Sequence, residues 1–292
     1  MPALSVIIPT IGRVEVVSRL VESLLQQDNP SFEIILATQL PEETRELSER
    51  WHDEKVRVVQ SPAVGTTAAR NAGVAASTAF VVIFLDDDVQ IDDQHFLSWH
   101  AAAYAEDARI GGVGGKILEN HQPPLGPEGQ IAGVSESGHV YASTASDVPQ
   151  DITAPRGGNM SFLRMVIDVV QGFDERFVGN AMREETDFSL RVVKAGYRIR
   201  FEPRAVVRHL AYPSGGSRRF DRRQWYEDFF TNEVYFFKQH FGHRSFPLFL
   251  LRKSRAILAC MFFYGRGRPS WLLTPWRGIV RGLQLAREAA RE

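Results

Sequence analysis

The sequence is poor in cysteine, in long apolar runs and in excess charge, and each absence excludes a class of protein. One cysteine, Cys260, occurs among 292 residues, which excludes a disulfide framework and a cysteine-based metal site. Because it lies in an apolar run, we expect it to be buried. No apolar run reaches the roughly 18 residues that a membrane-spanning helix needs. The N-terminus lacks the basic start and long apolar stretch of a signal peptide, so we expect a cytoplasmic protein.

Excess charge of one sign is also absent. The chain carries 34 Lys and Arg against 35 Asp and Glu, and this net charge of −1 excludes bulk attraction to nucleic acid. The charge is nevertheless uneven, because residues 246–292 hold nine basic residues and only two acids. With 44% hydrophobic residues, the composition is that of a globular protein with one large domain or two smaller ones.

Strand and helix patterns alternate at the start of the chain. Apolar runs predict strands over 4–10, 32–38, 56–61 and 79–88, and helical patterns occupy 13–27, 41–51 and 65–77. The strands lack polar alternation, which is typical of a parallel sheet covered by helices on both faces. The sequence therefore predicts an α/β fold, whose ligands bind at the carboxyl ends of the strands.

The remainder of the chain is less regular. Residues 119–155 are rich in Gly, Pro and Ser and predict a long irregular segment. Ordered structure returns over 156–177. Residues 184–209 predict a helix that stops at Gly196 and is followed by strands.

In the stretch VVIFLDDDVQ, residues 81–90, three adjacent aspartates follow directly after an apolar segment that predicts a buried strand. Asp86, Asp87 and Asp88 repel one another, and a hard divalent cation such as Mg²⁺ or Mn²⁺ would supply the counter-charge. If the chain stays extended, Asp86 and Asp88 point to one side and Asp87 to the other. The alternative is a solvated acidic turn or the acidic start of a helix.

Two acids, Glu184 and Glu185, open the pattern EETDFSLRVVKAGYRI, with Asp187 just after them. At the start of an amphipathic helix, capping and the helix dipole explain such acids without any further role. The functional interpretation makes one of them a general base, because a carboxylate among other acids and partly removed from water has a raised pKa.

Other polar positions permit both structural and functional interpretations. His209 ends a predicted strand, where it is either a structural residue or a ligand for a Mn²⁺-type metal. Arg70, in GTTAARNAG, suits a diphosphate but is equally a surface arginine paired with an acid. Gly157 and Gly158 allow either close backbone approach to a ligand or a tight turn.

The order of these motifs carries more information than any one of them. The series SVIIPT, GTTAARNAG, FVVIFLDDD, GGNMSF, GFDERF, EETDFSLRVVKAGYRI and PRAVVRH resembles the family 2 inverting glycosyltransferases of the GT-A fold, over residues 3–240. The resemblance implies a Rossmann-like, mostly parallel sheet. It divides the chain into a catalytic domain, 1–215, and a helical C-terminal region, 216–292. Within the domain, 1–110 would bind the nucleotide-sugar and 111–215 would face the acceptor.

The resemblance also assigns roles by position. It implies a nucleotide-diphosphate sugar donor, a hydroxyl acceptor and a Mn²⁺ or Mg²⁺ ion held by Asp86, Asp88 and His209. It makes Glu185 the catalytic base, with Glu184 beside it. The residues implied to seat the nucleotide-sugar are Pro9, Thr10, Arg13, Thr38, Arg70, Asp86 and Asp87. Those implied to lie near the donor sugar or the acceptor are Gly157, Gly158, Asn159 and Asp187.

Two positions depart from the family pattern. The second strand ends in Ala37, Thr38 and Gln39, where the family usually has an acidic residue for the base or ribose. Recognition of the nucleotide must therefore be neutral at this point or come from elsewhere in the chain. A UDP- or dTDP-linked donor is favoured. The base position holds Glu185 where Asp is more usual, which lengthens the side chain by one methylene without changing its chemistry.

The basic tail, 246–292, mixes aromatic and apolar runs with arginines. An amphipathic helix of this composition suits an anionic membrane surface, which would place the enzyme on the inner face of the cytoplasmic membrane with a lipid-linked or polysaccharide acceptor. The alternatives are a helical extension packed on the catalytic domain and an oligomer interface. The aromatic residues of 218–242 are predicted to cover the acceptor cleft.

Two other functions compete with glycosyl transfer. A metal-dependent nucleotidyltransferase also needs carboxylates beside a sheet, but it requires a Gly-rich basic loop after the first strand. The segment IIPTIGRVEVV offers one Gly and one Arg. A non-catalytic module that binds a nucleotide-sugar or a membrane surface is the second alternative, and the intact acids Asp86, Asp88 and Glu185 argue against it.

Overall fold

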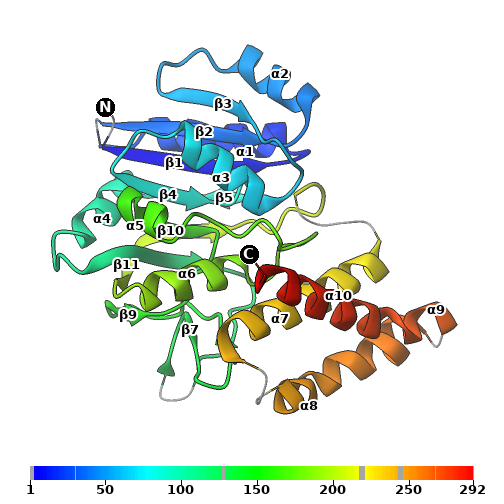
Figure 1. The fold of residues 1–292 in the computed structure, drawn as a ribbon. Coiled ribbons are helices and arrows are strands. Elements are labelled where there is room, and N and C mark those ends of the chain that lie inside the picture. The colour runs from blue at the N-terminus through cyan, green and yellow to red at the C-terminus, as the bar shows by residue number, and fades with distance from the viewer. Residues whose placement is uncertain are drawn as a thin grey trace.

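The structure is a computed structural model that describes residues 3–29, 31–126, 129–216, 221–242, 246–266 and 268–291. Its first half alternates as the sequence predicts (Figure 1). The elements are β1 (Leu4–Thr10), α1 (Val14–Leu25), β2 (Phe32–Thr38), α2 (Pro41–Arg50), β3 (Val56–Gln60), α3 (Thr66–Ala76) and β4 (Val81–Leu85). Each strand is followed by a helix that returns the chain for the next parallel strand, as a βα repeat requires.

The second half departs from this alternation. It contains β5 (Val89–Gln90), α4 (Phe96–Ala103), β6 (Ile110–Leu118), β7 (Gly133–Val134), β8 (Val140–Tyr141), β9 (Gln150–Ile152), β10 (Asn159–Leu163), α5 (Arg164–Val169), α6 (Glu184–Lys194) and β11 (Arg198–His209). Among the described residues of the predicted irregular segment 119–155, the only strands are the short β7, β8 and β9. The strands predicted after Gly196 form one long strand, β11.

The main sheet has the order β3-β2-β1-β4-β10-β6-β11-β5, with β9 also paired to β11. Strands β1 to β4 are parallel, as predicted, and so are β6 and β11. β10 lies between β4 and β6 and runs antiparallel to both, so the sheet is mixed. Because β10 is reversed, its beginning lies at the same edge as the carboxyl ends of β4 and β11. That edge therefore collects residues from three distant parts of the sequence.

Apolar side chains cover both faces of the sheet. One core cluster joins the strands to α1, α2 and α4, and includes Val17, Leu20 and Phe96. The cluster on the opposite face joins them to α3, α5 and α6, and includes Val74 and Phe188. The strands of the first half lack polar alternation because both of their faces are buried in this way.

The C-terminal part of the described chain is helical. It contains α7 (Arg222–Phe241), α8 (Phe246–Leu258), the π-helical turn η2 (Ala259–Tyr264), α9 (Pro269–Leu272) and α10 (Thr274–Ala289), which form one side of the molecule (Figure 1). Cys260 is buried in their shared core, as expected. Within the residues that the structure describes, no helix combines the length and the apolar character needed to cross a bilayer.

The aromatic side chains of α7 do not cover a cleft, contrary to expectation. Phe230 and Phe237 pack into the core that α7 shares with α8 and α10. Tyr235 and Phe236 pack against Phe177 and its neighbours in the loop before α6. These rings are buried because α7 has partners on both sides. Residues 218–220 of the predicted cover lie outside the described residues.

The backbone of α10 lies in close contact with the backbone of α7, because two residues of α10 at the contact are glycines. A Cβ atom built on Gly278 would stand 2.5 Å from the carbonyl oxygen of Glu227, and one on Gly282 would stand 2.5 Å from that of Thr231. Contacts this short with backbone atoms cannot be relieved by a rotamer change. The two glycines therefore set the distance between the helices.

We expect Gly282→Ala to destabilise the protein even though alanine is the better helix former by about 1 kcal/mol. The added methyl group must push α10 away from α7, and overpacking of this kind costs ~1–3 kcal/mol. Chemical denaturation of the variant should therefore show a lower free energy of unfolding. Gln284→Ala, at an exposed position of the same helix, is the matched control and should change stability little. Equal or higher stability of Gly282→Ala would contradict the close packing.

Candidate active site

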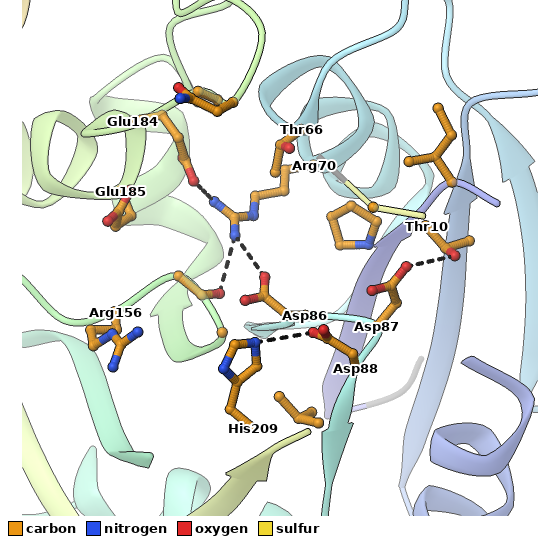
Figure 2. Close-up of a pocket in the computed structure, with 18 of the residues that line it drawn as sticks. Thr10, Thr66, Arg70, Asp86, Asp87, Asp88, Arg156, Glu184, Glu185 and His209 are labelled. Atoms are coloured by element: carbon orange, nitrogen blue, oxygen red, sulfur yellow. Dashed lines mark hydrogen bonds and ion pairs between the residues drawn. The ribbon is translucent and has the colours of Figure 1, made fainter. Parts of the chain in front are cut away.

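A cavity of about 390 Å³ opens at the edge of the sheet where β1, β4 and β11 end and β10 begins. Its lining also includes residues of α3 and the first turn of α6 (Figure 2). The predicted site residues that line it are Pro9, Thr10, Arg13, Arg70, Asp86, Asp87, Asp88, Gly157, Gly158, Glu184, Glu185 and His209. Segments separated by more than a hundred residues thus meet around one space.

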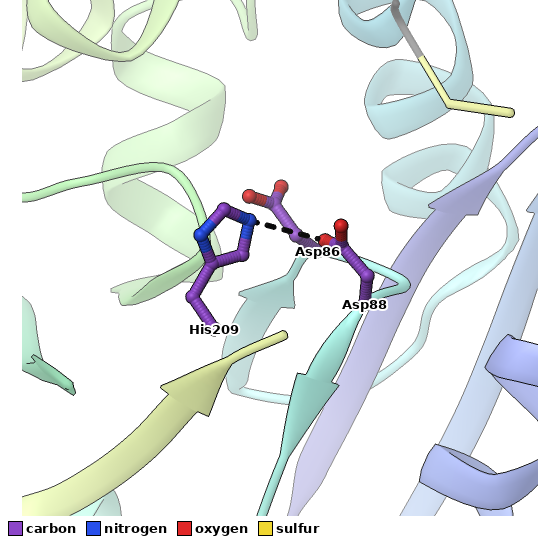
Figure 3. A group of neighbouring side chains, drawn as sticks. All are labelled: Asp86, Asp88 and His209. Atoms are coloured by element: carbon purple, nitrogen blue, oxygen red, sulfur yellow. Dashed lines mark ion pairs between the residues drawn. The ribbon is translucent and has the colours of Figure 1, made fainter. Parts of the chain in front are cut away.

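Asp86, Asp88 and His209 form a compact group at one side of this cavity (Figure 3). Each offers one ligand atom, and these atoms all lie within 4.8 Å of one another. Two carboxylates and an imidazole form a donor set that suits Mn²⁺ and leaves room for further oxygen ligands such as water or phosphate. The residues present therefore fit a divalent cation.

The charge of Asp88 is stabilised from several directions. His209 Nε2 lies 3.3 Å from one of its oxygens, Arg13 Nη1 lies 3.1 Å from the other, and the backbone N–H of Tyr212 donates to it. Although burial opposes ionisation, the hydrogen bond from His209 and the charge of Arg13 lower the pKa of Asp88. Hydrogen bonds to Asp88 and Glu119 in turn raise the pKa of His209 to about 9, so a cation that binds at Nε2 would have to displace a proton from it.

Asp87 has other partners than Asp86, although residues 87 and 88 form a turn and not the extended segment on which the expectation of opposite directions depended. It accepts hydrogen bonds from Thr10 Oγ1 at 2.9 Å and from Arg13 Nη1 at 2.6 Å. Burial raises the pKa of Asp87 to about 6 against the opposing charge of Arg13. Arg13 also donates to the carbonyl oxygens of Tyr212 and Ser214. The middle carboxylate therefore fastens β1 and, through Arg13, the loop after β11.

Arg70 and Glu184 form a buried ion pair on the other side of the cavity (Figure 2). Arg70 is 1% exposed, donates to the carbonyl oxygen of Gly157 at 3.1 Å and lies 3.6 Å from an oxygen of Asp86. Burial raises the pKa of Glu184, and the guanidinium of Arg70 opposes that shift. Arg70 thus joins α3, the turn before β10, β4 and α6.

Gly157 and Gly158 make room for the side chains of the site itself. A Cβ atom on Gly157 would lie 2.7 Å from the guanidinium of Arg70, and one on Gly158 would lie 2.7 Å from the carboxylate of Asp86. The close backbone approach that these glycines were predicted to allow is therefore made to Arg70 and Asp86.

Glu185 differs from its neighbour Glu184 in both burial and bonding. It is half-buried and lines the cavity, and within the described chain its carboxylate has no hydrogen-bonding or ionic partner. It lies in the first turn of α6, where the positive end of the helix dipole favours negative charge. Glu185 is therefore the acid of this pair that is free to interact with a bound molecule.

The start of α6 is held in place by a buried ionic group. Arg183, the residue before the helix, adopts a left-handed conformation with φ of 81°. Its guanidinium lies 2.8 Å from the carboxylate of Glu233 on α7, which also lies 2.7 Å from Lys253 on α8. The C-terminal helices thereby fix the position from which Glu184 and Glu185 project.

Three of the predicted contact residues lie outside the lining of the cavity. Thr38 is buried and donates to the carbonyl oxygen of Val59. Asn159 bonds to the ring of His100 and to two backbone carbonyl groups within the sheet. Asp187 pairs with Arg191 and His240 on the far side of α6. Each of these polar side chains is satisfied by the protein itself, so a structural role replaces the predicted contact.

The sequence analysis missed a second ionic pair at the site. Arg156 forms a bidentate pair with Glu119 at 2.6 and 2.8 Å, and Glu119 also lies 3.3 Å from Nδ1 of His209. Glu119 thus contacts the ring from the side opposite Asp88 and orients it. The available signals were the position of Glu119 just after strand β6 and that of Arg156 next to Gly157.

Comparison with known proteins agrees with this geometry. Residues 5–165 match the sequence profile described as glycosyl transferase family 2, which covers more than half of the chain. The chain belongs to this family. The resemblance predicted from the motifs is therefore confirmed, and the C-terminal helices lie beyond the matched residues.

Curated relatives of the family-2 chain are distant and much longer. It is 28% identical over 239 residues to the uncharacterized protein y4gI of Sinorhizobium fredii, covering 74% of this chain and 25% of that protein. It is 26% identical over 223 residues to the O-antigen biosynthesis protein RfbC of Myxococcus xanthus, covering 68% of this chain and 16% of that protein. The chain thus spans a quarter or less of these two relatives.

Solved structures confirm the predicted GT-A type of fold. The mannosyltransferase PcManGT of Pyrobaculum calidifontis, in complex with GDP-Man and Mn²⁺, matches 99% of this family-2 chain and 80% of its own chain, with a TM-score of 0.58 and 18% identity. GalNAc-T7 with UDP, GalNAc and Mn²⁺ matches 82% of this chain and 48% of its own, with a TM-score of 0.60 and 17% identity.

We expect Asp88→Asn to weaken Mn²⁺ binding by at least tenfold, because it removes a charged ligand from the group that fits the metal. Isothermal titration with MnCl₂ measures this directly. Asp92→Asn is the matched control, since Asp92 is an exposed acid four residues along the chain. Unchanged affinity in Asp88→Asn, or equal loss in both variants, would contradict the assignment.

Glu233→Gln should destabilise the protein by about 2 kcal/mol at neutral pH, because it leaves the half-buried charges of Arg183 and Lys253 without their buried counter-ion. Although burial opposes ionisation, these two cations lower the pKa of Glu233 below its usual value of 4.5. The stabilisation is therefore complete above that value and is lost as the pH falls through the native pKa.

Denaturation curves of the wild type and Glu233→Gln should accordingly converge in acid. Glu227→Gln, a half-buried position on the same helix, controls for the change in net charge. A stability difference that persists unchanged at low pH would show that packing, and not charge, explains the effect.

Proposed function

We propose that the protein is a metal-dependent inverting glycosyltransferase. It moves a sugar from a nucleotide-diphosphate donor to a hydroxyl group on a lipid-linked or polysaccharide glycan. The observation that carries this proposal is the meeting of the Asp86, Asp88 and His209 group with the unpaired carboxylate of Glu185 around one cavity. A donor that spans this cavity would place its diphosphate beside Asp86, Asp88 and His209 and direct its sugar towards Glu185.

The donor is seated by the carboxyl edge of the sheet. Pro9, Thr10 and Gln39 line the end of the cavity formed by β1 and β2, where they can contact the nucleoside. The amide of Gln39 offers neutral hydrogen bonds in place of the acidic residue usual in the family, and a UDP- or dTDP-linked donor stays part of the proposal. Asp86, Asp88 and His209 would hold a divalent cation, which would supply positive charge to the leaving diphosphate.

Glu185 acts as the general base. Its carboxylate accepts the proton of the acceptor hydroxyl as that oxygen attacks the anomeric carbon. The bond between the anomeric carbon and the diphosphate oxygen breaks, and the diphosphate leaves with the electron pair. Attack from the opposite face inverts the configuration, as in other single displacements at a sugar.

Glu184 has a different role, because Arg70 occupies its carboxylate. The pair holds the first turn of α6 against the turn that carries Gly157 and Gly158. Arg70 is thereby kept 3.6 Å from an oxygen of Asp86, where its charge offsets part of the repulsion between the acids at this edge. Glu184 is a positioning residue in this mechanism, and Glu185 is the one that reacts.

A nucleotidyltransferase is less well supported. Such an enzyme needs free basic groups after the first strand, but Arg13 is 7% exposed and is already paired with Asp87 and Asp88. The relative from Myxococcus xanthus is an O-antigen biosynthesis protein, which supports a cell-envelope glycan as the acceptor. Such an acceptor would bring the protein to the inner face of the cytoplasmic membrane, with residues 246–292 in peripheral contact.

We expect Glu185→Gln to lower turnover by ~10²–10⁴-fold, the usual contribution of a general base. The amide has nearly the same shape but cannot take the proton, so donor binding should be retained. Transfer rates and donor affinity, measured with Mn²⁺ present across a panel of nucleotide-sugars, test both parts.

Glu54→Gln is the control for Glu185→Gln, because Glu54 is an exposed acid that does not line the cavity. Full activity of Glu185→Gln would disprove the base assignment. Donor turnover by the wild type that is indifferent to removal of divalent metal would disprove the metal-dependent mechanism.

A further inference from the structure

α8 carries apolar side chains on two faces. Its inner face packs into the C-terminal core through Phe249 and Ile257, next to Cys260. A second set of apolar side chains points outward along α8 and η2, with exposed fractions that run from 46% to 75%. The set consists of Leu248, Leu251, Leu258, Phe262 and Phe263, and Leu251 is 68% and Phe263 75% exposed. We call these five residues the outer stripe.

The outer stripe follows helical geometry. Leu248, Leu251 and Leu258 are separated by three and seven residues, which places them on one face of α8, and Phe262 and Phe263 follow in the π-helical turn η2. Arg255 lies within the same face and Arg252 beside it, and both are exposed. An exposed apolar row with arginines in and beside it is the pattern of a helix that lies in a membrane interface.

A cavity of about 610 Å³ adjoins the outer stripe, between α8 and the hairpin of β7 and β8. The hairpin contributes Ser135, Ser137 and His139, and the helix contributes Arg252 and Arg255. Arg252 Nη1 donates to the carbonyl oxygen of Ser137 at 2.9 Å, which anchors one arginine across the opening. Arg255 has no hydrogen-bonding or ionic partner among the described residues.

The electrostatics of this cavity favour an anion. No carboxylate appears among the described residues that line it. Burial lowers the pKa of His139, and the charges of Lys253, Arg183 and Arg252 lower it further, whereas the carboxylate of Glu233, which pairs with Arg183 and Lys253, opposes the shift. The arginines that line the cavity itself, Arg252 and Arg255, therefore supply its positive charge. The cavity is lined by serine hydroxyl groups and arginine side chains, which are hydrogen-bond donors that suit a phosphate group.

We propose that the outer stripe docks the protein on an anionic lipid bilayer and that lipid phosphate groups bind in the cavity lined by Arg252 and Arg255. The apolar side chains would enter the boundary between headgroups and acyl chains, and the arginines would stay at headgroup depth. This inference rests on the proposed function for its purpose, which is to bring the active site to a lipid-linked acceptor.

A bilayer fits this surface better than a second copy of the chain. A symmetric dimer brings the same patch of each subunit together, so Arg252 and Arg255 would face the same arginines of the other copy. An anionic bilayer offers both the apolar layer and the negative charge that the surface lacks. The excess of nine basic residues over two acids in 246–292 extends this complementarity beyond the stripe.

The docking surface is rigidly connected to the active site. On the inner side of α8, Lys253 lies 2.7 Å from Glu233, which is paired in turn with Arg183 next to Glu184. α8 therefore cannot rotate about its axis without breaking a buried ionic group. A bilayer bound to the outer stripe would meet the cavity of the active site in one orientation.

Sedimentation of the full chain with vesicles tests the proposal. We expect the protein to pellet with vesicles that contain phosphatidylglycerol and far less with phosphatidylcholine alone, and we expect this binding to weaken as salt is added. Arg252→Gln with Arg255→Gln should lower the partition coefficient by ~25-fold, at about fivefold for each basic residue near the surface. Phe262→Ser with Phe263→Ser should lower it by more than ~10-fold through lost apolar burial.

Matched controls separate these effects from changes in net charge or hydrophobicity. Arg19→Gln with Arg45→Gln removes the same charge from exposed positions elsewhere, and Phe80→Ser removes an aromatic ring that is 70% exposed. Neither control should change vesicle binding by more than about twofold. For the arginine control the reason is that charges farther from the bilayer than the ~10 Å screening length interact with it only weakly. Thermal unfolding of each variant verifies that the fold is kept.

Several outcomes would overturn the docking proposal. They are equal binding to both kinds of vesicle, no binding to either, and equal losses in the stripe variants and the controls. Light scattering that shows a dimer, lost in Phe262→Ser with Phe263→Ser, would assign the stripe to a second copy instead. The proposed function fails separately, because Asp88→Asn should still bind vesicles, and Arg252→Gln with Arg255→Gln should still hydrolyse or transfer from a soluble donor.

Discussion

The concentration of negative charge at one edge of the sheet is the constraint on which the rest of the structure depends. Asp86, Asp87, Asp88, Glu184, Glu185 and Glu119 converge there, and folding must overcome their mutual repulsion. Three arginines neutralise much of this negative charge. Arg13 pairs with Asp87 and Asp88, Arg70 pairs with Glu184, and Arg156 pairs with Glu119. Arg13 and Arg70 also donate to backbone carbonyl groups of other segments, so the same contacts that neutralise charge also hold the active site together.

Neighbouring acids in this sequence have different tasks because the backbone sends them in different directions. Asp86 and Asp88 lie with His209, whereas Asp87 between them fastens Thr10 and Arg13. Glu184 is buried against Arg70, whereas the carboxylate of Glu185, one residue later, has no hydrogen-bonding or ionic partner in the part of the chain that the structure describes. In both cases one carboxylate stabilises the framework and its neighbour remains available to a ligand. Each acidic motif therefore contains one residue that the structural interpretation explains and another that stays a candidate for the functional one.

The C-terminal helices belong to this arrangement although they lie beyond the family match. α7 and α8 hold the start of α6 through Glu233, and α10 supports α7 through a backbone contact that only glycine permits. The outer side of α8 is apolar and basic, whereas its inner side is part of the core. α8 can thus support the catalytic domain on its inner side and carry the proposed membrane contact on its outer side. The ion pairs of Glu233 with Lys253 and Arg183 connect this helix to the start of α6 at the active site.

By itself, the sequence determined the alternating strands and helices of the first half, the α/β class and the acidic motifs, because these depend on local spacing of apolar and charged residues. Only the tertiary structure decided that β10 is reversed between β4 and β6, which brings Gly157 and Gly158 against Arg70 and Asp86. It alone also showed that Thr38, Asn159 and Asp187 bond within the protein, that Glu119 and Arg156 orient His209, and that the aromatic rings of α7 are core. The physical reason is that the role of a polar side chain depends on which distant segment satisfies it, and no local pattern records that partner.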